Sequence, residues 1–420
     1  MSDDQGNDRS PRLVTGRNGR RLFSMAALSE RVREEFLLEY AGTPALSEAD
    51  TSSQRMRLVL GVVDYVIAVE SLAMGSDDKA VLIQRVYSEL FGYGALDPFF
   101  ADASVTTIAL NGTDHVAVRY GSQDLQELGA IFEDADQLQT VVTRILEDAG
   151  VDLTPEQPIV ETGLQIGGRR VSVSVISPTI STAGVGIVAD IRLHPPIAPT
   201  LAELVASEVL TRDAADTLIA LARSKYGFVI AGETETGKTT LLNALALEID
   251  LTGVVAIERT GEMRLPATVT CYQPSWGTVD SAPVTFGDRI DLALADAPSV
   301  MMIDEVRADE PASIAPLLAR ADAPRQWWVF RGAPDHKRLQ SALGMLARRA
   351  ETGAGETLVH ALYERLPFVV SVARIQGRLR LFSIAEWQSR IDTEYPDYVQ
   401  LFRYDNAAAR RTEAVFARWV

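Results

Sequence analysis

Residues Phe228 to Ala246 read FVIAGETETGKTTLLNALA, in which a short apolar run is followed by a polar loop and then by helical spacing. Within this stretch, Gly232, Gly237, Lys238 and Thr239 fit the phosphate-binding P-loop pattern G-x-x-x-x-G-K-[ST]. In such a loop, backbone N–H groups at a helix N-terminus hold phosphate oxygens, the lysine neutralises the β and γ phosphates, and the hydroxyl holds Mg²⁺. The flanking strand and helix favour a true P-loop over a chance match, so the sequence predicts a site for ATP and Mg²⁺.

The overall composition limits the class of protein. With 420 residues, the chain is long enough for roughly two or three domains. The net charge is −17 and only four residues are lysines, which argues against a binder of duplex nucleic acid. Cys271 stands alone, which fits a reducing cytosol. The sequence has no signal-like apolar N-terminus and no apolar run of the ~18 residues that a membrane span needs. We therefore expect a cytoplasmic protein with at most peripheral membrane contact.

Changes in apolar spacing divide the chain into segments. Helical spacing begins at Leu22, and strand-like runs begin after Phe91. After the stiff, Pro-rich stretch LHPPIAP, helix and strand signals alternate to about Trp387, as in a parallel α/β sheet. The predicted segments are a disordered tail (1–21), a helical N-terminal extension (22–90), an N-terminal α/β domain (91–192), a linker (193–199), a P-loop domain (200–387) and a C-terminal tail (388–420).

Several individual elements can be placed within these segments. The expected strands are 106–110 and 116–120, joined by a hairpin turn at 111–114, and then 171–176 and 187–191. A helix is expected from Ala135 to Glu147, because its apolar residues share one face. The run WWVF (327–330) is interpreted as a buried strand, with a partner-docking surface as the alternative.

Motifs on both sides of the P-loop resemble a known family. The run FGYGALDP (91–98), followed by VTTIALNG (105–112), resembles the "FGLGPLEPLL…VTEIMVNG" segment of the CpaF-type ATPases. The P-loop helix KTTLLNAL (238–245), the run IDEVR (303–307) against "VGEVR", and LFRYD (401–405) against "PLFRWD" extend the match in order. From about 85 to 405, the chain is thus similar to the type II/type IV secretion ATPase superfamily, whose CpaF type includes the Tad/Flp pilus motor.

This resemblance implies a fold and an assembly. The fold class would be α/β, with an N-terminal α/β domain and a RecA-like P-loop NTPase domain that contains a mainly parallel sheet. ATP and Mg²⁺ would lie in the cleft between the two domains of a ring, most simply a hexamer. Inner-membrane platform proteins of a Tad-type pilus or secretion system would be the partners, at the inner face of the plasma membrane, and nucleic acid would not be one.

The resemblance also assigns roles to individual residues. Glu305 follows an apolar strand and matches the Walker B glutamate that polarises the attacking water, and Glu258 and Glu262 match the carboxylates of the "IEDxxEL" box that helps to hold Mg²⁺ and water. In the first domain, Arg192 matches an arginine that faces the nucleotide, and either Arg169 or Arg170 matches a second one. An ordinary strand residue is the alternative for each. The expected cofactor-binding set is Gly232, Gly237, Lys238, Thr239, Thr240, Arg192 and Arg170, with Thr239 as the Mg²⁺ ligand.

Several positions around the expected nucleotide depart from the family. Glu233 and Glu235 stand where the family's "GGTGSGKT" has glycine, Arg259 replaces the aspartate of "IED", and Asp304 replaces the Walker B glycine. A carboxylate ~4 Å from a phosphate charge costs roughly 4 kcal/mol at an effective dielectric near 20. Two such carboxylates would cancel most of a micromolar affinity, which is worth about 8 kcal/mol. The loop therefore either turns both carboxylates outward or holds ATP weakly.

Cations expected near the nucleotide are also missing. The stretch DLALADAPS (291–299) has no arginine where the family has "RNALRMRPD", and WVFRGAP (328–334) has no histidine where the family has "TTIHANS". Arg331 is the candidate to replace that histidine, since guanidinium pairs well with phosphate. Loss of such cations is expected to suppress turnover.

Two functions from different classes follow. The first is a CpaF-like ATPase of a Tad-type pilus or a type II/IV secretion machine, in which ATP drives rigid-body movement of one domain against the other. The second is a catalytically degenerate paralogue that regulates an active relative or shares a mixed ring with it. An unrelated P-loop NTPase that acts alone fits the ordered motifs less well.

Overall fold

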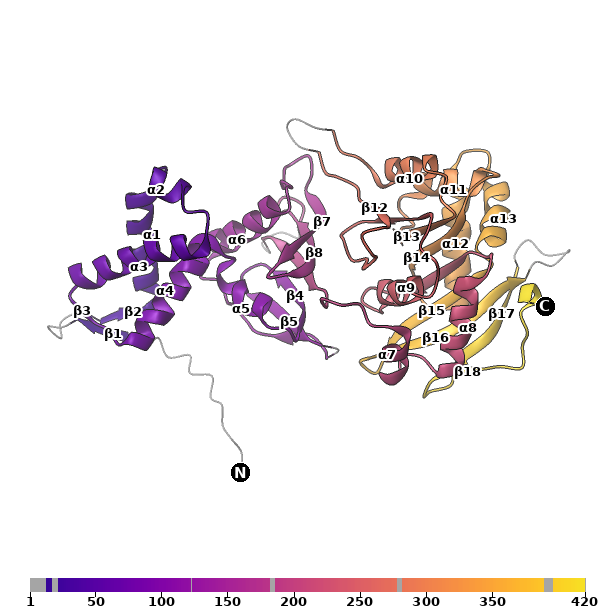
Figure 1. Cartoon of the computed structure of the whole chain (residues 1–420), viewed down its shortest axis with the longest axis horizontal. Helices are drawn as coiled ribbons and strands as arrows, with labels where there is room; N and C mark the ends of the chain where they lie inside the picture. Colours follow the sequence, from indigo (N-terminus) through magenta and orange to yellow (C-terminus); the bar gives the residue numbers. More distant parts are fainter. Residues whose placement is uncertain are drawn as a thin grey trace, which may run out of the picture. The chain divides into compact units, whose positions relative to one another are not determined.

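The computed structural model describes residues 13–16, 22–121, 123–181, 186–277, 282–388 and 396–419. The chain divides into two compact units, Met1–Asp102 and Ala103–Val420, which are considered separately (Figure 1). Of the segment predicted as a disordered tail, only 13–16 lie among the described residues, and they form strand β1 (Leu13–Gly16). This strand pairs with β2 (Leu22–Ser24) and β3 (Leu72–Ala73), so that part of the predicted tail is ordered.

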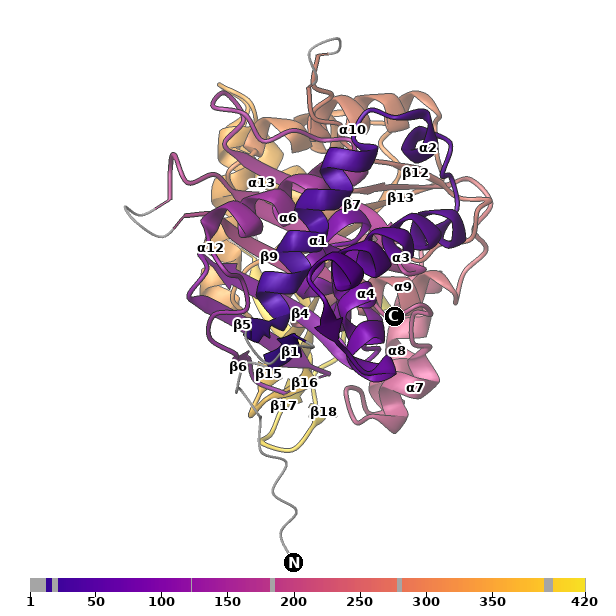
Figure 2. The ribbon, with the colours of Figure 1, turned by 90° about the vertical axis from the view of Figure 1, so that its left-hand side faces the viewer.

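The first unit is a helical bundle, as the apolar spacing predicts (Figure 2). Its helices are α1 (Met25–Tyr40), α2 (Pro44–Ser47), α3 (Ser52–Val69), α4 (Ser76–Phe91) and α5 (Asp97–Ala101), with a 3-10 turn η1 (Gly94–Leu96). Thr51 starts α3 with a capping box, in which its hydroxyl and the side chain of Gln54 satisfy each other's backbone N–H groups. Leu28, Phe36 and Val63 belong to the shared core of α1, α3 and α4.

The second unit begins with a six-stranded antiparallel sheet in the order β6-β5-β4-β9-β8-β7. Its strands are β4 (Val105–Asn111), β5 (His115–Tyr120), β6 (Gln126–Glu127), β7 (Ile159–Ile166), β8 (Arg169–Ile176) and β9 (Val188–Leu193). The predicted hairpin is confirmed, and Gly112 supplies the positive φ of +70° that its turn requires. The predicted helix is α6 (Ala135–Asp148), which buries the expected apolar face.

The rest of the second unit is built on a nine-stranded sheet in the order β12-β11-β13-β14-β10-β15-β16-β17-β18. Neighbouring strands are parallel from β12 to β15, which confirms the predicted mainly parallel sheet. Its strands are β10 (Phe228–Gly232), β11 (Val254–Glu258), β12 (Thr270–Tyr272), β13 (Val300–Val306), β14 (Arg325–Arg331), β15 (Phe368–Ile375), β16 (Arg378–Gln388), β17 (Asp397–Tyr404) and β18 (Ala409–Arg411).

Helices cover both faces of this sheet (Figure 1). One face packs against α7 (Leu201–Ala206), α8 (Arg212–Arg223) and α9 (Lys238–Ala246). The other packs against α10 (Phe286–Ala295), the 3-10 turn η2 (Pro311–Ile314), α11 (Ala315–Ala319), α12 (His336–Ala350) and α13 (Gly355–Arg365). A short 3-10 turn, η3 (Ala417–Trp419), lies near the C-terminus.

The apolar run at 327–330 is a buried strand, as predicted. Because side chains alternate across a sheet, Trp327 packs into the core on one face of the sheet and Trp328 into the core on the other. Both are fully buried, so the alternative of a docking surface is wrong for these side chains.

The parallel alternation ends earlier than the sequence predicts. Strand β16 returns antiparallel to β15 through a two-residue turn, in which Gln376 and Gly377 have φ values of +49° and +75°. Two successive positive φ values match the twist of a tight hairpin, which can join only antiparallel strands. Residues 388–420 were predicted to be a C-terminal tail, but they contribute β17 and β18 to the same sheet.

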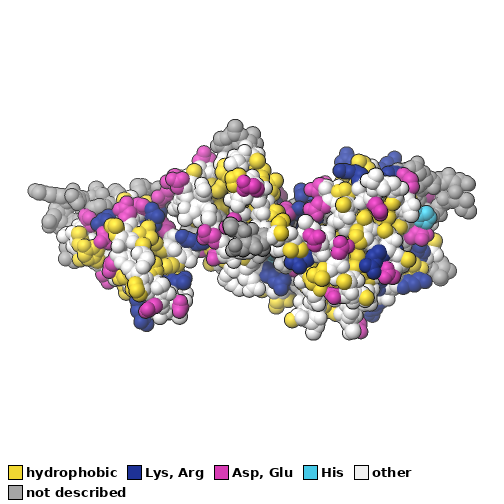
Figure 3. All heavy atoms as spheres, turned by 90° about the horizontal axis from the view of Figure 1, so that it is seen from above, with side chains coloured by type: hydrophobic (Ala, Val, Ile, Leu, Met, Phe, Trp, Pro, Cys, Tyr) yellow, Lys and Arg dark blue, Asp and Glu magenta, His cyan; other side chains and the backbone are white. Residues whose placement is uncertain are grey.

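The surface carries both signs of charge. Figure 3 shows basic and acidic side chains intermixed over the visible face. Ion pairs at the surface of the protein, such as Arg223 with Glu248 at 3.2 Å, contribute little to stability. Among the described helices, none has both the length and the apolar character needed to cross a membrane.

Candidate functional site

The P-loop lies at the carboxyl end of β10, where the strand runs through a tight loop into α9. Gly232 has no room for a side chain, because a Cβ atom there would lie 2.4 Å from Thr236 Oγ1 and 2.6 Å from the carbonyl oxygen of Val372. Gly237 caps α9 with a φ of +81°, which suits glycine. Lys238 is the first residue of α9, so the free backbone N–H groups at the start of this helix lie at the loop.

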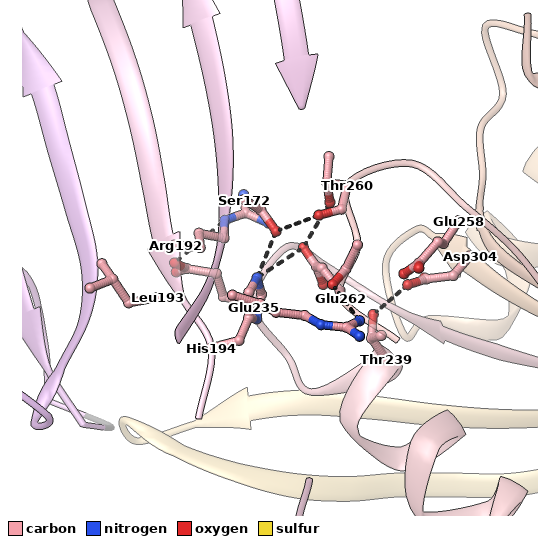
Figure 4. A network of polar contacts seen from close by, with 12 residues as sticks. Ser172, Arg192, Leu193, His194, Glu235, Thr239, Glu258, Thr260, Glu262 and Asp304 are labelled. Carbon is pink, nitrogen blue, oxygen red and sulfur yellow. Dashed lines mark hydrogen bonds and ion pairs between the residues drawn. The ribbon is translucent and has the colours of Figure 1, made fainter. Parts of the chain in front are cut away.

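Lys238 and Thr239 face two acidic residues at the end of β13. The Lys238 Nζ atom donates a hydrogen bond to the carbonyl oxygen of Glu233 at 2.8 Å and lies 3.5 Å from Glu305 Oε2. Thr239 Oγ1 donates to Asp304 Oδ2 at 3.0 Å (Figure 4). Burial raises the pKa of Asp304 well above its ordinary value, and the negative charges of Glu262 and Glu305 raise it further. This carboxyl group is therefore buried at high cost beside the P-loop hydroxyl.

Glu305 is held between two cations. Besides Lys238, its carboxylate accepts a hydrogen bond from Arg307 Nε at 3.3 Å. Arg307 also pairs with Glu161 of β7 at 2.7 Å, which joins the antiparallel sheet to the end of β13. The carboxylate proposed to polarise water is thus already paired within the protein.

The two acidic residues assigned to the box that holds Mg²⁺ and water, Glu258 at the end of β11 and Glu262 in the loop after it, lie in different places. Glu258 is buried and accepts hydrogen bonds from the backbone N–H of Met263 at 2.7 Å and from Gln273 Nε2 at 3.0 Å. Burial raises the pKa of Glu258, although these hydrogen bonds oppose the rise. Glu262 is less buried and lies 3.8 Å from His194, whose Nε2 atom lies 2.6 Å from Ser172 Oγ (Figure 4). Glu258 thus holds the loop after β11, while Glu262 faces the cavity described below.

The predicted arginines also separate. Arg192 of β9 lines the cavity and pairs with Asp190 at 2.8 Å. Arg170 of β8 donates to the carbonyl oxygens of Gly261 and Met263, and Arg169 donates to that of Val105 at 2.7 Å. Neither Arg169 nor Arg170 is among the described residues that line the cavity, so Arg170 fastens the loop after β11 to the antiparallel sheet.

The two P-loop glutamates point in different directions. Glu233 is exposed and does not line the cavity among its described residues. Glu235 turns to the antiparallel sheet, where its carboxylate accepts hydrogen bonds from Thr107 at 2.8 Å and from Arg119. Burial alone would raise the pKa of Glu235, but these hydrogen bonds and the charges of Arg119 and Arg192 outweigh it and lower the pKa. Glu235 is therefore held as a carboxylate.

The two arginines that depart from the family differ in their pairing. Arg259 forms a bidentate pair with Glu310, at 3.0 and 2.8 Å, and lies over the ring of Phe286 at 4.0 Å. Arg331, at the end of β14, lines the cavity, and no ion pair or hydrogen bond of its side chain is seen among the described residues. Arg331 is therefore the lining cation most open to an added anion.

These residues surround one cavity of about 590 Å³ within the second unit. Its lining comes from β4, β5 and β7 to β9 on one side, and from the P-loop, the loop after β11 and the ends of β13 to β15 on the other. Its volume is typical of a small-molecule site. Of the residues assigned to phosphate or metal, it brings together Gly237, Lys238, Thr239, Thr240, Arg192, Glu262 and Glu305.

The residues present fit a nucleotide with Mg²⁺. Thr239 and Asp304 place a hydroxyl and a carboxylate 3.0 Å apart beside the P-loop lysine. In P-loop NTPases, Mg²⁺ is held by this kind of hydroxyl and by a strand-end aspartate, with phosphate oxygens completing its shell. The described residues hold no cluster of three or more acidic, His or Cys side chains that would bind a metal without such phosphates.

Sequence reasoning missed several residues of this cavity. Asp304 was noted only as a replacement for glycine, although an aspartate directly after an apolar strand is the usual partner of the P-loop hydroxyl. Thr107 and Arg119 gave no local signal, because they meet Glu235 only through contacts across more than a hundred residues of sequence. His194 lies in the Pro-rich stretch predicted as a linker, and it also lines the cavity.

Comparisons with known proteins match most of the chain. The family model described as type II/IV secretion system protein matches residues 98–320. A putative conjugal transfer protein of Mycobacterium tuberculosis is 26% identical over 322 residues, which cover 74% of this chain and 89% of that protein. The type IV secretion system protein PtlH of Bordetella pertussis is 27% identical over 243 residues, which cover 52% of this chain and 70% of that protein.

Solved structures also align with the chain. The ATPase DotB of Legionella pneumophila covers 73% of this chain and 82% of its own, with 15% identity and a TM-score of 0.49. The VirB11 ATPase of the Brucella suis type IV secretion system, in complex with sulphate, covers 72% of this chain and 96% of its own, with 20% identity and a TM-score of 0.35.

Proposed function

Because the chain belongs to the type II/IV secretion system protein family, we propose that it binds a nucleotide with Mg²⁺ in the cavity at its P-loop and serves a secretion or pilus machine. The observation that carries this proposal is the P-loop itself. Lys238 and Thr239 begin a helix at the carboxyl edge of a parallel sheet, opposite Asp304 and Glu305. Ligands of open α/β sheets bind at this edge.

Each residue of the cavity then has a chemical role. The N–H groups at the start of α9 and the Lys238 ammonium would hold phosphate oxygens, and Arg331 would offer a further guanidinium. Thr239 and Asp304 would hold Mg²⁺, which supplies charge neutralisation on the phosphates. Glu305 would accept a hydrogen bond from the attacking water and orient it. Glu262 and Arg192 would line the same space, with Glu258 and Arg170 fixing the loop beside it.

Nucleotide binding is tested by thermal unfolding of the full chain with Mg²⁺ and either ADP or ATP. A ligand at 100 times its dissociation constant adds about 2.7 kcal/mol to the free energy of unfolding. We expect this gain for the native chain and for Lys337→Ala, whose exposed lysine lies outside the cavity lining, and not for Lys238→Ala. No gain with either nucleotide for the native chain would refute the proposal.

A second function, that of a regulatory paralogue with little or no turnover, is favoured by the pairing of the cavity's cations. Arg119, Arg192 and Arg307 each have a carboxylate partner, and Glu305 is itself held by Lys238 and Arg307. A cation that already has a carboxylate partner stabilises the developing phosphate charge less, because the negative carboxylate and the negative phosphate repel each other. Such a chain would cap or regulate a ring of an active relative, or share a mixed ring with it.

Steady-state release of phosphate from ATP separates the two functions. We expect weak turnover, which fits the regulatory paralogue, and we expect Glu305→Gln to abolish it, because this change removes the water-orienting carboxylate and keeps its shape. Brisk turnover that both Glu305→Gln and Lys238→Ala abolish would instead establish the motor and exclude the regulatory paralogue. Nucleotide binding without any release above the Lys238→Ala background would establish the paralogue.

Within the family, the CpaF type of the Tad/Flp pilus is the subtype that we propose. The runs at 91–98, 105–112 and 401–405 support this assignment. A ring, most simply a hexamer, at the cytoplasmic face of the inner membrane and in contact with platform proteins, follows from that subtype. Light scattering of the purified chain with and without nucleotide tests the ring.

A further inference from the structure

Glu235 occupies a backbone position that suits glycine. Its φ is +59°, in the left-handed region that residues with a Cβ atom rarely adopt. A non-glycine residue remains in this region only when its surroundings hold it there. Here the surroundings are the contacts of its own side chain with the antiparallel sheet, together with Arg374 Nη2, which donates to the Glu235 carbonyl oxygen at 3.3 Å.

The Glu235 carboxylate accepts hydrogen bonds from side chains that line the cavity. Thr107 and Arg119 each donate to it, and Arg192 Nε lies 4.0 Å from its Oε1 atom. All four residues line the cavity that contains Lys238 and Thr239. The Arg119 Nε atom is buried and has no hydrogen-bond partner among the described residues, so this guanidinium retains one donor that Glu235 does not satisfy.

The two sides of the cavity offer a phosphate chain different charges: one side is formed by the start of α9 and the other by the antiparallel sheet. The phosphates nearest to α9 would be held by Lys238 and by the helix N-terminus, where Asp304 lies 3.0 Å from Thr239 and Glu305 lies 3.5 Å from Lys238. The cavity lining across from α9 comes from the antiparallel sheet, so a longer phosphate chain would bring its terminal charge closer to Thr107, Arg119 and Glu235. There the guanidinium groups are already paired and a carboxylate stands beside them, so the added charge gains less attraction and meets repulsion.

From this geometry we infer that Glu235 makes the site selective for nucleoside diphosphates over nucleoside triphosphates, because its carboxylate occupies Arg119 and takes the place of a terminal phosphate. The inference rests on the proposed nucleotide binding. It differs from that proposal because it names the ligand class and a single residue that sets it. Glu233, in the same loop, has no such part, because its side chain is exposed and lies outside the cavity lining.

The test is isothermal titration of the full chain with Mg²⁺ and either ADP or the non-hydrolysable ATP analogue AMPPNP. The native chain is expected to bind ADP at least tenfold more tightly than AMPPNP. Glu235→Gln removes the charge, and Glu235→Gly also suits the positive φ, so at least one of them should fold as the native chain does. In either variant the preference should shrink by at least tenfold, mainly through tighter binding of AMPPNP. Glu233→Gln, which makes the same change in net charge, should keep the native preference.

Three results would overturn the inference. The first is a native chain that binds AMPPNP as tightly as ADP. The second is a folded Glu235 variant whose two affinities change by the same factor, and the third is an equal response of Glu233→Gln. If neither ligand binds the native chain or any folded variant, the proposed function fails as well, so the two failures can be told apart.

Discussion

At the residue scale, Asp304 is a residue that would help to bind Mg²⁺ but lowers the stability of the fold. Its carboxyl group is buried beside Thr239, where a carboxylate suits Mg²⁺ and is costly without it. The pKa of Asp304 is raised in the folded protein, so the folded state binds its proton more tightly than the unfolded state does. Stability from this group is therefore complete at low pH and is lost as the pH rises through the folded pKa.

We therefore predict that Asp304→Asn raises the thermal stability of the nucleotide-free chain, and more at pH 8 than at pH 5. The gain at high pH is about 1.4 kcal/mol for every unit by which the folded and unfolded pKa values differ. The asparagine still accepts a hydrogen bond from Thr239, while the Mg²⁺ dependence of nucleotide binding should weaken. Thermal unfolding and titration with Mg²⁺ measure the two effects.

The matched control is Asp309→Asn, which removes an exposed carboxylate five residues away in the same sequence region. We expect no stabilisation from this change at either pH. A gain for Asp304→Asn that is equal at both pH values would contradict the assigned cause, because only a titrating carboxyl group gives a pH-dependent difference.

At the element scale, β7 lies directly against the loop that follows β11. A Cβ atom on Gly163 would lie 2.0 Å from the carbonyl oxygen of Thr260, so only glycine allows this approach. Further along, Arg170 donates to the backbone of the same loop, and Trp276 Nε1 donates to the carbonyl oxygen of Glu161 at 2.6 Å. The contacts of Gly163 and Arg170 fix the loop that carries Glu262 against the antiparallel sheet, and the Trp276 contact fixes the segment after β12 against β7.

Gly163→Ala is expected to destabilise the chain by about 1–3 kcal/mol, the usual cost of forcing an extra methyl group into a packed site. The matched change Gly61→Ala lies in the exposed middle of α3, where a Cβ atom meets nothing within 4 Å. This change should stabilise by up to about 1 kcal/mol, because alanine is the better helix former. Denaturant unfolding measures both, and equal effects of the two substitutions would show that Thr260 does not constrain β7.

At the scale of the whole molecule, the site and the helical bundle are separable. Every described residue that lines the cavity falls between Thr106 and Leu379, within the second compact unit. The first unit has its own core, to which Leu28, Phe36 and Val63 contribute. Nucleotide binding should therefore not require the first unit.

We predict that a chain starting at Ala103 keeps the native dissociation constant for Mg²⁺ and ADP to within about threefold, which is less than 1 kcal/mol. Isothermal titration measures the constant, and circular dichroism confirms that the shortened chain is folded. A folded chain whose affinity falls more than tenfold would show that the helical bundle contributes to the site. This result would leave the P-loop assignment untouched.

The sequence by itself determined the fold class, the P-loop and several of the strands, because these features depend on residues that are close together along the chain. Local sequence was enough to predict three features: the apolar run before Gly232, the turn around Gly112 and the apolar face of α6. The return of β16 had a weaker local signal, the pair Gln376 and Gly377, whose turn geometry became clear only in the structure.

Only the tertiary structure decided what the charged residues do, because their partners lie far away in sequence. Glu235 meets Arg119 across 116 positions, and Arg259 meets Glu310 across 51. Whether a carboxylate weakens phosphate binding or stabilises the site depends on the group that it faces, and the packing of the sheets determines that group. The sequence therefore placed glutamates in a phosphate loop, and the packing turned one toward solvent and the other toward an arginine.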